Sequence, residues 1–156
     1  MMKEKIFLFE EHWIRVGATL FWALFWMLNA IDKVASGSAY WAGKVRAEKM
    51  LAYFSSINLG EPWIANASLA LAGILEFVAG ALFFISLVLF FMHKKFLAHR
   101  FFFWGTATGI VIFSGFIIFD VIFGDRAELL EHSIYWLIVM MSWVVYNYAH
   151  KFVRGE

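Results

Sequence analysis

The chain has 156 residues, of which 63% are hydrophobic, 21% aromatic and only 16% charged, with a net charge of +1. Soluble domains are typically about 45–50% apolar and about 25% charged, and a chain this short has too little interior to bury the excess. The composition therefore excludes a soluble enzyme, a disordered chain and a nucleic-acid-binding protein. It predicts an integral membrane protein whose first partner is the lipid bilayer.

Four segments are long and apolar enough to cross a membrane. A membrane-spanning helix needs about 20 mostly apolar residues, because the hydrocarbon layer is about 30 Å thick. The segments cover about residues 14–31, 64–92, 101–123 and 129–149. Lipid cannot satisfy a bare backbone, so each segment should be a helix. We therefore predict an all-α, polytopic membrane protein in which residues 1–156 form a single four-helix bundle.

The first span carries a polar and aromatic stripe at helical spacing. Its members are Arg15, Thr19, Trp22, Trp26, Asn29 and Lys33. The two cations at its ends either extend toward the membrane surfaces or face the interior of the bundle, and the alignment of the stripe favours the interior. Residues 1–13 precede this span. Glutamates interrupt them too often for a signal peptide, so we expect an amphipathic lead-in.

A long connection, residues 32–63, follows the first span. Within it, residues 41–54 interleave apolar and charged side chains in a pattern that suits a helix lying in the membrane interface. Pro62 immediately precedes the second span and suits the first position of a helix. The connections after the second and third spans are short.

Glu76 is the outstanding residue of the second span, because it lies about twelve residues from either end of the apolar segment. An isolated carboxylate at mid-membrane costs at least ~2.5 kcal/mol. Small residues share its helix face and would let another helix approach closely: Ser68, Ala72 and Gly80. We expect Glu76 to be buried between helices, either as a neutral acid that stabilises the bundle or as a group that handles protons or a ligand. The first candidate site comprises Glu76, Arg15, Lys33 and Asn29.

The third and fourth spans supply a second candidate site. Gly105 and Gly109 have the GxxxG spacing, which indicates close helix packing. Several polar residues gather on the side opposite the termini, where the acids also suit the dipole of the fourth helix. The predicted polar basin comprises Asp120, Glu128, His132 and Tyr135, with Trp41 and Trp63 at its rim.

No metal is assigned to this basin. Glu128 and His132 share a helix face and Asp120 would reach them, a combination that suits several transition metals. The repeated Glu-x-x-His motif of di-iron bundles and the HExxH motif of zinc proteases do not occur in the sequence. The 19 phenylalanines and 8 tryptophans would line a groove for a quinone or a carotenoid, although lipid-facing packing explains most of them. No cofactor is assigned beyond a quinone or lipid.

Lysine and arginine counts predict the orientation. Eight lie on the side of the termini and five on the other side. The positive-inside rule then places both termini in the cytoplasm. We expect the protein in a prokaryotic inner membrane.

Several short patterns in residues 14–90 resemble the DoxX-like family of small four-helix membrane proteins. The first span opens with Arg15 and closes with Ala30-Ile31-Asp32-Lys33, where alanine replaces the glycine of Gly-x-x-Lys. Tyr53-Phe54 and Gly60-Glu61-Pro62 precede the second span, in which Glu76 is followed by Gly80. The segment GDRAELLEHSIYW has no counterpart in the family pattern, so the resemblance gives no support to Glu128 or His132.

The resemblance implies a membrane component of oxidoreductase systems. Our leading hypothesis is an accessory subunit, structural or quinone-adjacent, that assembles with other membrane subunits. The alternative is an enzyme of quinone or thiosulfate chemistry, in which Glu76 exchanges protons while Arg15, Lys33 and His132 bind an anionic or quinone headgroup. A small transporter or channel is a third hypothesis, although the inverted repeats and broken helices usual in transporters are not found in the sequence.

Overall fold

The computed structural model describes the backbone of residues 2–34 and 43–154, and the side chains of residues 12–33 and 45–148. Apart from short turns, these backbone ranges are helical. The helices are α1 (Met2–Val34), α2 (Gly43–Ser56), α3 (Pro62–Phe91), α4 (Lys95–Phe123) and α5 (Arg126–Arg154). Four contain stretches long and apolar enough to cross a membrane: His12–Lys33, Pro62–Phe91, Lys95–Phe123 and Arg126–Tyr148. The predictions of an all-α chain and of four long apolar helices are confirmed.

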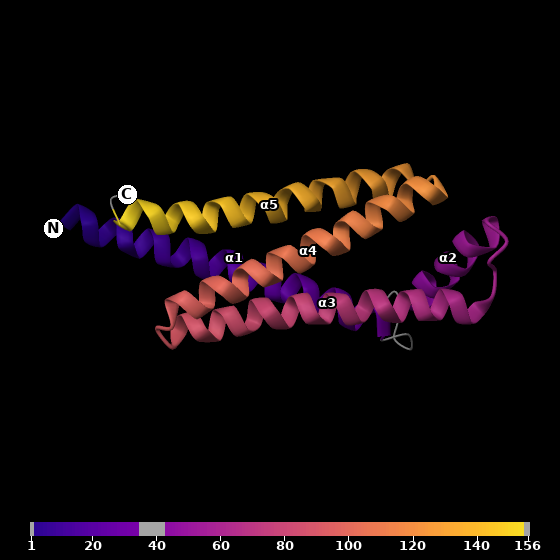
Figure 1. Cartoon of the computed structure of the whole chain (residues 1–156), viewed down its shortest axis with the longest axis horizontal. Coiled ribbons are helices and arrows are strands. Elements are labelled where there is room, and N and C mark those ends of the chain that lie inside the picture. The colour runs from indigo at the N-terminus through magenta and orange to yellow at the C-terminus, as the bar shows by residue number, and fades with distance from the viewer. Residues whose placement is uncertain (1, 35–42, 155–156) are drawn as a thin grey trace.

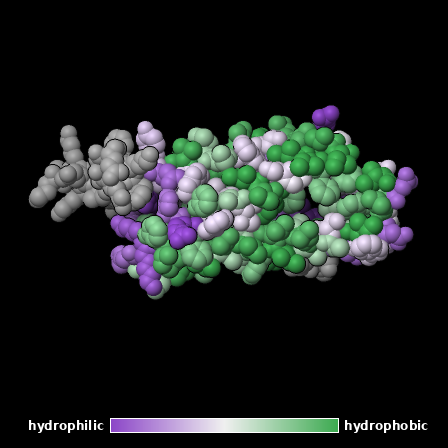
Figure 2. All heavy atoms as spheres, in the orientation of Figure 1, coloured by the Kyte–Doolittle hydropathy of each residue, from purple (hydrophilic) through white to green (hydrophobic). Residues whose placement is uncertain are grey.

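The four long helices lie alongside one another, and both chain termini are at the same end of the molecule (Figure 1). The short helix α2 lies at the opposite end, beside the beginning of α3. Figure 2 shows an apolar surface over most of the middle of the molecule, with hydrophilic residues gathered nearer its two ends. This distribution is the one expected of a bundle whose middle faces hydrocarbon.

The helices extend beyond the predicted segments. α1 is continuous over 33 residues, so the amino-terminal lead-in and the first span form a single helix. α4 begins at Lys95 rather than near residue 101, because lysine and arginine continue a helix beyond its apolar part without breaking it. α2 confirms a helix in the first loop, and the described part of it runs from Gly43 to Ser56, two residues beyond the predicted end at 54. Trp41, a predicted rim residue, lies outside the described residues.

The turn between α3 and α4 is a Schellman motif built without glycine. The His93 N–H donates to the Phe90 carbonyl at 3.0 Å, and the Lys94 N–H donates to the Leu89 carbonyl at 2.9 Å. This pattern requires a left-handed residue after the helix, and His93 has φ of 60°. At the other end of α3, Pro62 occupies the first turn as predicted.

The turn between α4 and α5 uses glycine and an acidic cap. Gly124 ends α4 in the left-handed conformation, with φ of 74°. The Glu128 N–H then donates to Asp125 Oδ1 at 3.0 Å. Aspartate is a preferred N-cap because its oxygen satisfies an amide that the helix leaves unpaired. The tight reversal places α5 antiparallel to α4.

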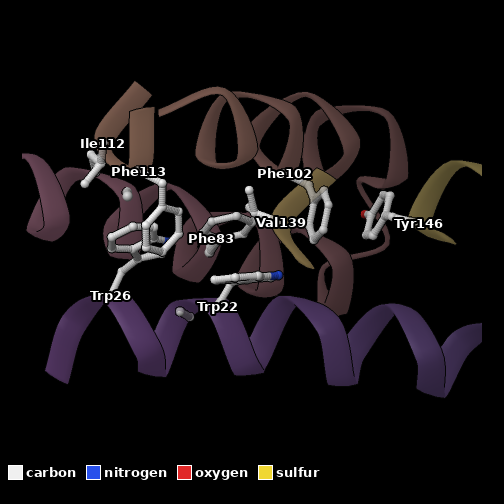
Figure 3. Close-up of a cluster of buried hydrophobic side chains, with 10 residues drawn as sticks. Trp22, Trp26, Phe83, Phe102, Ile112, Phe113, Val139 and Tyr146 are labelled. Atoms are coloured by element: carbon white, nitrogen blue, oxygen red, sulfur yellow. The ribbon is translucent and has the colours of Figure 1, made fainter. Parts of the chain in front are cut away.

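Aromatic side chains from all four long helices fill the centre of the bundle. Trp22 and Trp26 of α1 are 0% exposed, and Figure 3 shows them rising from α1 toward the rings of the other helices. Trp26 lies 4.8 Å from Phe113 of α4 between ring centroids. Trp22 Nε1 donates to Ser142 Oγ at 2.9 Å, which joins α1 to α5. The inward orientation predicted for this stripe is therefore confirmed.

Glycines set the closest helix approaches. A Cβ on Gly80 would lie 2.8 Å from Met27 Cγ and 3.0 Å from the Met27 backbone nitrogen. A Cβ on Gly105 would lie 3.0 Å from the Phe83 ring, and one on Gly109 would lie 3.1 Å from Trp26. The predictions of close packing at these glycines are confirmed.

Candidate functional site

Glu76 forms a buried ion pair with Lys33. The glutamate is 2% exposed, and the side chain of Lys33 is 8% exposed. Lys33 Nζ donates to Glu76 Oε1 at 2.6 Å and to Oε2 at 2.7 Å, so both carboxylate oxygens are engaged by one ammonium group. The prediction that Glu76 is buried between helices is confirmed, and the alternative that Lys33 extends to the surface is wrong.

Neighbouring helices enclose the lysine. A Cβ on Gly73 of α3 would lie 3.6 Å from Lys33 Cβ, so the glycine leaves room for the lysine stem. The Phe116 ring of α4 lies 5.7 Å from Lys33 Nζ, within the range of a cation–π contact. Glu76 is midway along the second apolar segment. The lysine that it binds belongs to the last turn of α1, so the middle of α3 contacts the end of α1.

Asp120 and His132 form a second buried contact between α4 and α5. His132 Nδ1 and Asp120 Oδ2 are 2.7 Å apart, and Asp120 is buried. The Phe116 ring lies 4.9 Å from the His132 ring. Phe116 therefore contacts both the His132–Asp120 pair and the Lys33–Glu76 pair.

α2 contributes a third set of polar contacts, which we call the α2 cluster. It consists of Arg46, Lys49 and Tyr53 of α2 with Asp32, Asp125 and Glu128 of the bundle. Arg46 Nε binds Asp32 Oδ2 at 2.6 Å. Lys49 Nζ binds Asp125 at 2.9 Å and Glu128 at 2.5 Å. The Tyr53 hydroxyl donates to Asp125 at 2.5 Å. These contacts fasten α2 to α1 and to the α4–α5 turn.

The cluster shifts the acid–base behaviour of its members. Asp125 accepts hydrogen bonds from the Tyr53 hydroxyl, the Glu128 N–H and Lys49. These three bonds together lower the pKa of Asp125. Burial by itself would lower the pKa of Lys49, but its contacts with Glu128, Tyr53 and Asp125 outweigh burial and raise that pKa. Burial and the hydrogen bond to Asp125 raise the pKa of Tyr53. The charged forms of Asp125 and Lys49 are therefore favoured.

The first candidate site is not a single site. Arg15 is inward, as predicted, but eighteen residues separate it from Lys33, which is about 27 Å along a helix. Its guanidinium lies 5.0 Å from the Tyr146 ring. The Asn29 amide donates to the Phe25 carbonyl of its own helix at 2.8 Å. Only Lys33 and Glu76 of the four residues are therefore joined by a hydrogen bond.

The second candidate site is also divided. Asp120 and His132 lie inside the bundle, whereas Glu128 belongs to the α2 cluster. Tyr135 packs among aromatic rings, with centroids 5.1 Å from Phe25 and 5.7 Å from Phe113. Trp63 of the predicted rim is 68% exposed. Of the four predicted basin residues, Glu128 is the one that a side chain of α2 contacts, through Lys49.

The sequence contained a signal for the contacts of α2. Arg46, Lys49 and Tyr53 are three and four residues apart, so they share one face of α2. The apolar residues of α2 directed the prediction toward a membrane interface instead. Phe54 is buried, and its centroid lies 5.7 Å from that of Phe123, so the helix also packs against α4.

Chemically, the arrangement pairs each of two buried acids with a side chain of another helix. Among the described residues, no group of three His, Cys, Asp or Glu side chains is placed to hold a metal ion. Glu76 and Asp120 each bind a basic side chain from another helix. Glu76 would meet a ligand only after Lys33 had moved away, because Lys33 engages both of its oxygens.

No family model matches the sequence, and no curated protein or solved structure matches it. The likeness to the DoxX-like family therefore remains an expectation founded on short sequence patterns. Over its described residues, the protein is a helical bundle whose buried polar pairs and α2 cluster lie toward the end opposite the termini.

Proposed function

We propose that this chain is a small DoxX-like integral membrane subunit that serves as an accessory component of a membrane oxidoreductase or respiratory complex. The observation that carries the proposal is the closed Lys33–Glu76 pair. Both glutamate oxygens bind the lysine within the chain, which favours a role in fixing the bundle over a role in turning over a substrate. Removing one member of such a pair would strand a buried charge.

The outer surface supports assembly within a membrane. α5 exposes a broad row of large apolar side chains, and its helix neighbours cover only its other side. The exposed row comprises Leu130, Ile134, Leu137, Met141, Val144 and Tyr148. Such a face suits lipid or a helix of another subunit. We propose that it lies in the bilayer next to the partner.

We also propose a prokaryotic inner-membrane location with both termini in the cytoplasm. The eight Lys and Arg residues on the terminal side, against five on the other side, support this orientation. In this setting α2 lies on the non-cytoplasmic side, where its contacts with the bundle are ionic as well as apolar.

Co-purification tests the proposal. The tagged chain is extracted in a mild detergent and run on a native gel that is stained for quinone reduction. We expect it to migrate with additional subunits that carry the redox activity. Isolation as a single, fully folded chain from every mild extraction would contradict the proposal.

A double variant separates the accessory role from catalysis by Glu76. Lys33→Met with Glu76→Leu replaces the buried pair with apolar side chains of similar size. If the pair only fixes the bundle, the complex should form and retain its quinone reduction. If Glu76 exchanges protons with a quinone, the double variant should assemble normally and lose that reduction.

A further inference from the structure

An open groove of about 290 Å³ lies between α4 and α5, toward the end of the bundle that carries the termini. Its lining combines basic and aromatic side chains: His99, Arg100, Phe103, Trp104 and Trp143. None of them belongs to the Lys33–Glu76 pair, the His132–Asp120 pair or the α2 cluster. The groove is therefore separate from the candidate sites described above.

The second half of α3, the α3–α4 turn and most of α4, which borders this groove, carry charge of one sign. Residues 77–119 contain no aspartate or glutamate but carry Lys94, Lys95 and Arg100, together with two histidines. The Arg100 guanidinium lies 5.9 Å from the Phe96 ring. Among the described residues, no carboxylate forms an ion pair with Arg100. Its donors are consequently available to an external anion.

Aromatic rings form the rest of the groove. Trp143 packs against Phe102, and the two rings are stacked with their centroids 6.2 Å apart. The His99 ring lies 5.1 Å from Trp143, and the Phe103 ring lies 5.2 Å from it. Trp104 is 53% exposed. Tryptophans near the end of a membrane span favour the level of the lipid headgroups.

We propose that this groove binds the headgroup of an anionic phospholipid. Arg100 donates to the phosphate, because a guanidinium matches phosphate geometry with two parallel hydrogen bonds. The His99 imidazole lies beside that phosphate, and the aromatic rings contact the glycerol and the first carbons of the acyl chains. A lipid fits better than free phosphate because most of the lining is aromatic and the flanking helix faces are apolar. Basic sites between membrane helices on the cytoplasmic side recognise lipids in this way.

Native mass spectrometry of the intact chain in detergent tests this inference. Phosphatidylglycerol and phosphatidylcholine with identical acyl chains are titrated separately, and the bound lipid is counted. We expect wild type to retain phosphatidylglycerol preferentially and Arg100→Gln to weaken that binding about fivefold, the usual effect of one cation near a lipid surface. Trp104→Leu should weaken the binding of both lipids, since it removes ring contacts and leaves the charge unchanged.

Two substitutions are matched controls for loss of charge. Lys94→Gln removes a cation from the neighbouring turn, and Arg126→Gln removes one at the opposite end of the bundle. Both should retain most of the lipid that Arg100→Gln loses. Equal losses in Lys94→Gln and Arg100→Gln would overturn the proposal, because binding would then follow general charge and not the groove. Equal retention of both lipids by wild type would overturn it as well.

A phosphate arm distinguishes the lipid from the free anion. Inorganic phosphate at millimolar concentration should neither displace phosphatidylglycerol nor raise the melting temperature of the chain. If phosphate alone does both, the groove is an anion site and the lipid proposal is wrong. The inference rests on the membrane setting and the orientation given under the proposed function, and on no role of partner subunits. The test uses the isolated chain, so its result does not depend on whether partner subunits exist.

Discussion

Glu76 shows how one residue can dominate the stability of a small bundle. A buried charge is tolerated only when a partner satisfies it, and breaking a buried pair destabilises more than the pair itself contributes. Lys33 is the ion-pair partner of Glu76 among the described residues. The net effect of a substitution therefore depends on whether the other charge remains.

We predict that Lys33→Met lowers the free energy of unfolding by about 3–5 kcal/mol, because the Glu76 carboxylate stays buried without its cation. Lys33→Met combined with Glu76→Leu should recover most of that loss. Thermal unfolding in detergent, followed by near-ultraviolet circular dichroism, measures both variants. The exposed Lys95→Met is the control and should leave the melting temperature unchanged. A double variant as unstable as Lys33→Met would contradict the coupling of the two residues.

At the scale of the helices, the closest contacts are made at glycine residues. α1 approaches α3 so closely at Gly80 that an added Cβ would meet the Met27 backbone nitrogen at 3.0 Å. Backbone cannot yield as a flexible side chain can, so the two helices would have to separate. Gly17 of α1 provides the contrast, since an added Cβ there has nothing within 4 Å.

Gly80→Ala should therefore destabilise the bundle by about 1–3 kcal/mol through overpacking. Gly17→Ala should be neutral or stabilising by up to about 1 kcal/mol, because alanine favours a helix more than glycine does. The melting temperatures of the two variants, measured in the same detergent, show whether only Gly80→Ala is destabilising. Equal effects at the two glycines would show that helix propensity, and not the α1–α3 contact, governs both.

The docking of α2 should depend on Asp125 and resist changes of pH. Asp125 has a lowered pKa, so its contribution is present above the ordinary aspartate range and is lost only as the pH falls through the lowered value. Lys49 has a raised pKa, so its contribution is present below the ordinary lysine value and is lost as the pH rises through the raised one. Docking should accordingly stay constant from about pH 5 to pH 9.

Hydrogen exchange of the α2 amides, corrected for the intrinsic effect of pH, measures this docking. We expect Asp125→Asn to accelerate exchange about tenfold, because the variant weakens charged hydrogen bonds with Lys49 and Tyr53. Glu48→Gln changes an exposed charge on the same helix and should have little effect. Unchanged exchange in Asp125→Asn would mean that the apolar contacts of Phe54 alone hold the helix.

The helices could be predicted from the sequence, and Lys33 was placed in one candidate site with Glu76, but the direct ion pair between the two could not be predicted. Apolar length and small-residue spacing were sufficient to predict the spans and the burial of Glu76, because both depend on local pattern. The pairing of Glu76 with Lys33 depends on the register of α1 against α3, which the sequence does not encode locally. Arg15 was grouped with them because it shares a helix face with Lys33, although about five turns separate the two residues.

At the scale of the whole molecule, the two ends differ in charge. The end with the termini carries eight Lys and Arg residues against four acids, whereas the opposite end carries five against eight. Three of the acids at the opposite end form ion pairs with Arg46 and Lys49 of α2, so they also hold this helix on the bundle. The proposed orientation rests on the cations of this count, because acids contribute little to the positive-inside rule.

The orientation can be tested directly because the chain has no cysteine of its own. In intact spheroplasts, a membrane-impermeant maleimide should label a Glu61→Cys variant and leave a Lys94→Cys variant unlabelled. Both positions are exposed at turns, so neither substitution should disturb the helices. The reverse labelling pattern would place the termini outside the cytoplasm.

The closed pair between α1 and α3 has one more consequence in a membrane. A transmembrane voltage does about 2.3 kcal/mol of work per 100 mV on an elementary charge that crosses the full field. Lys33 and Glu76 are opposite charges 2.6 Å apart that are held by two different helices, so any shift that moves them together transfers almost no net charge. This pair therefore gives the bundle almost no charge on which a membrane voltage could act.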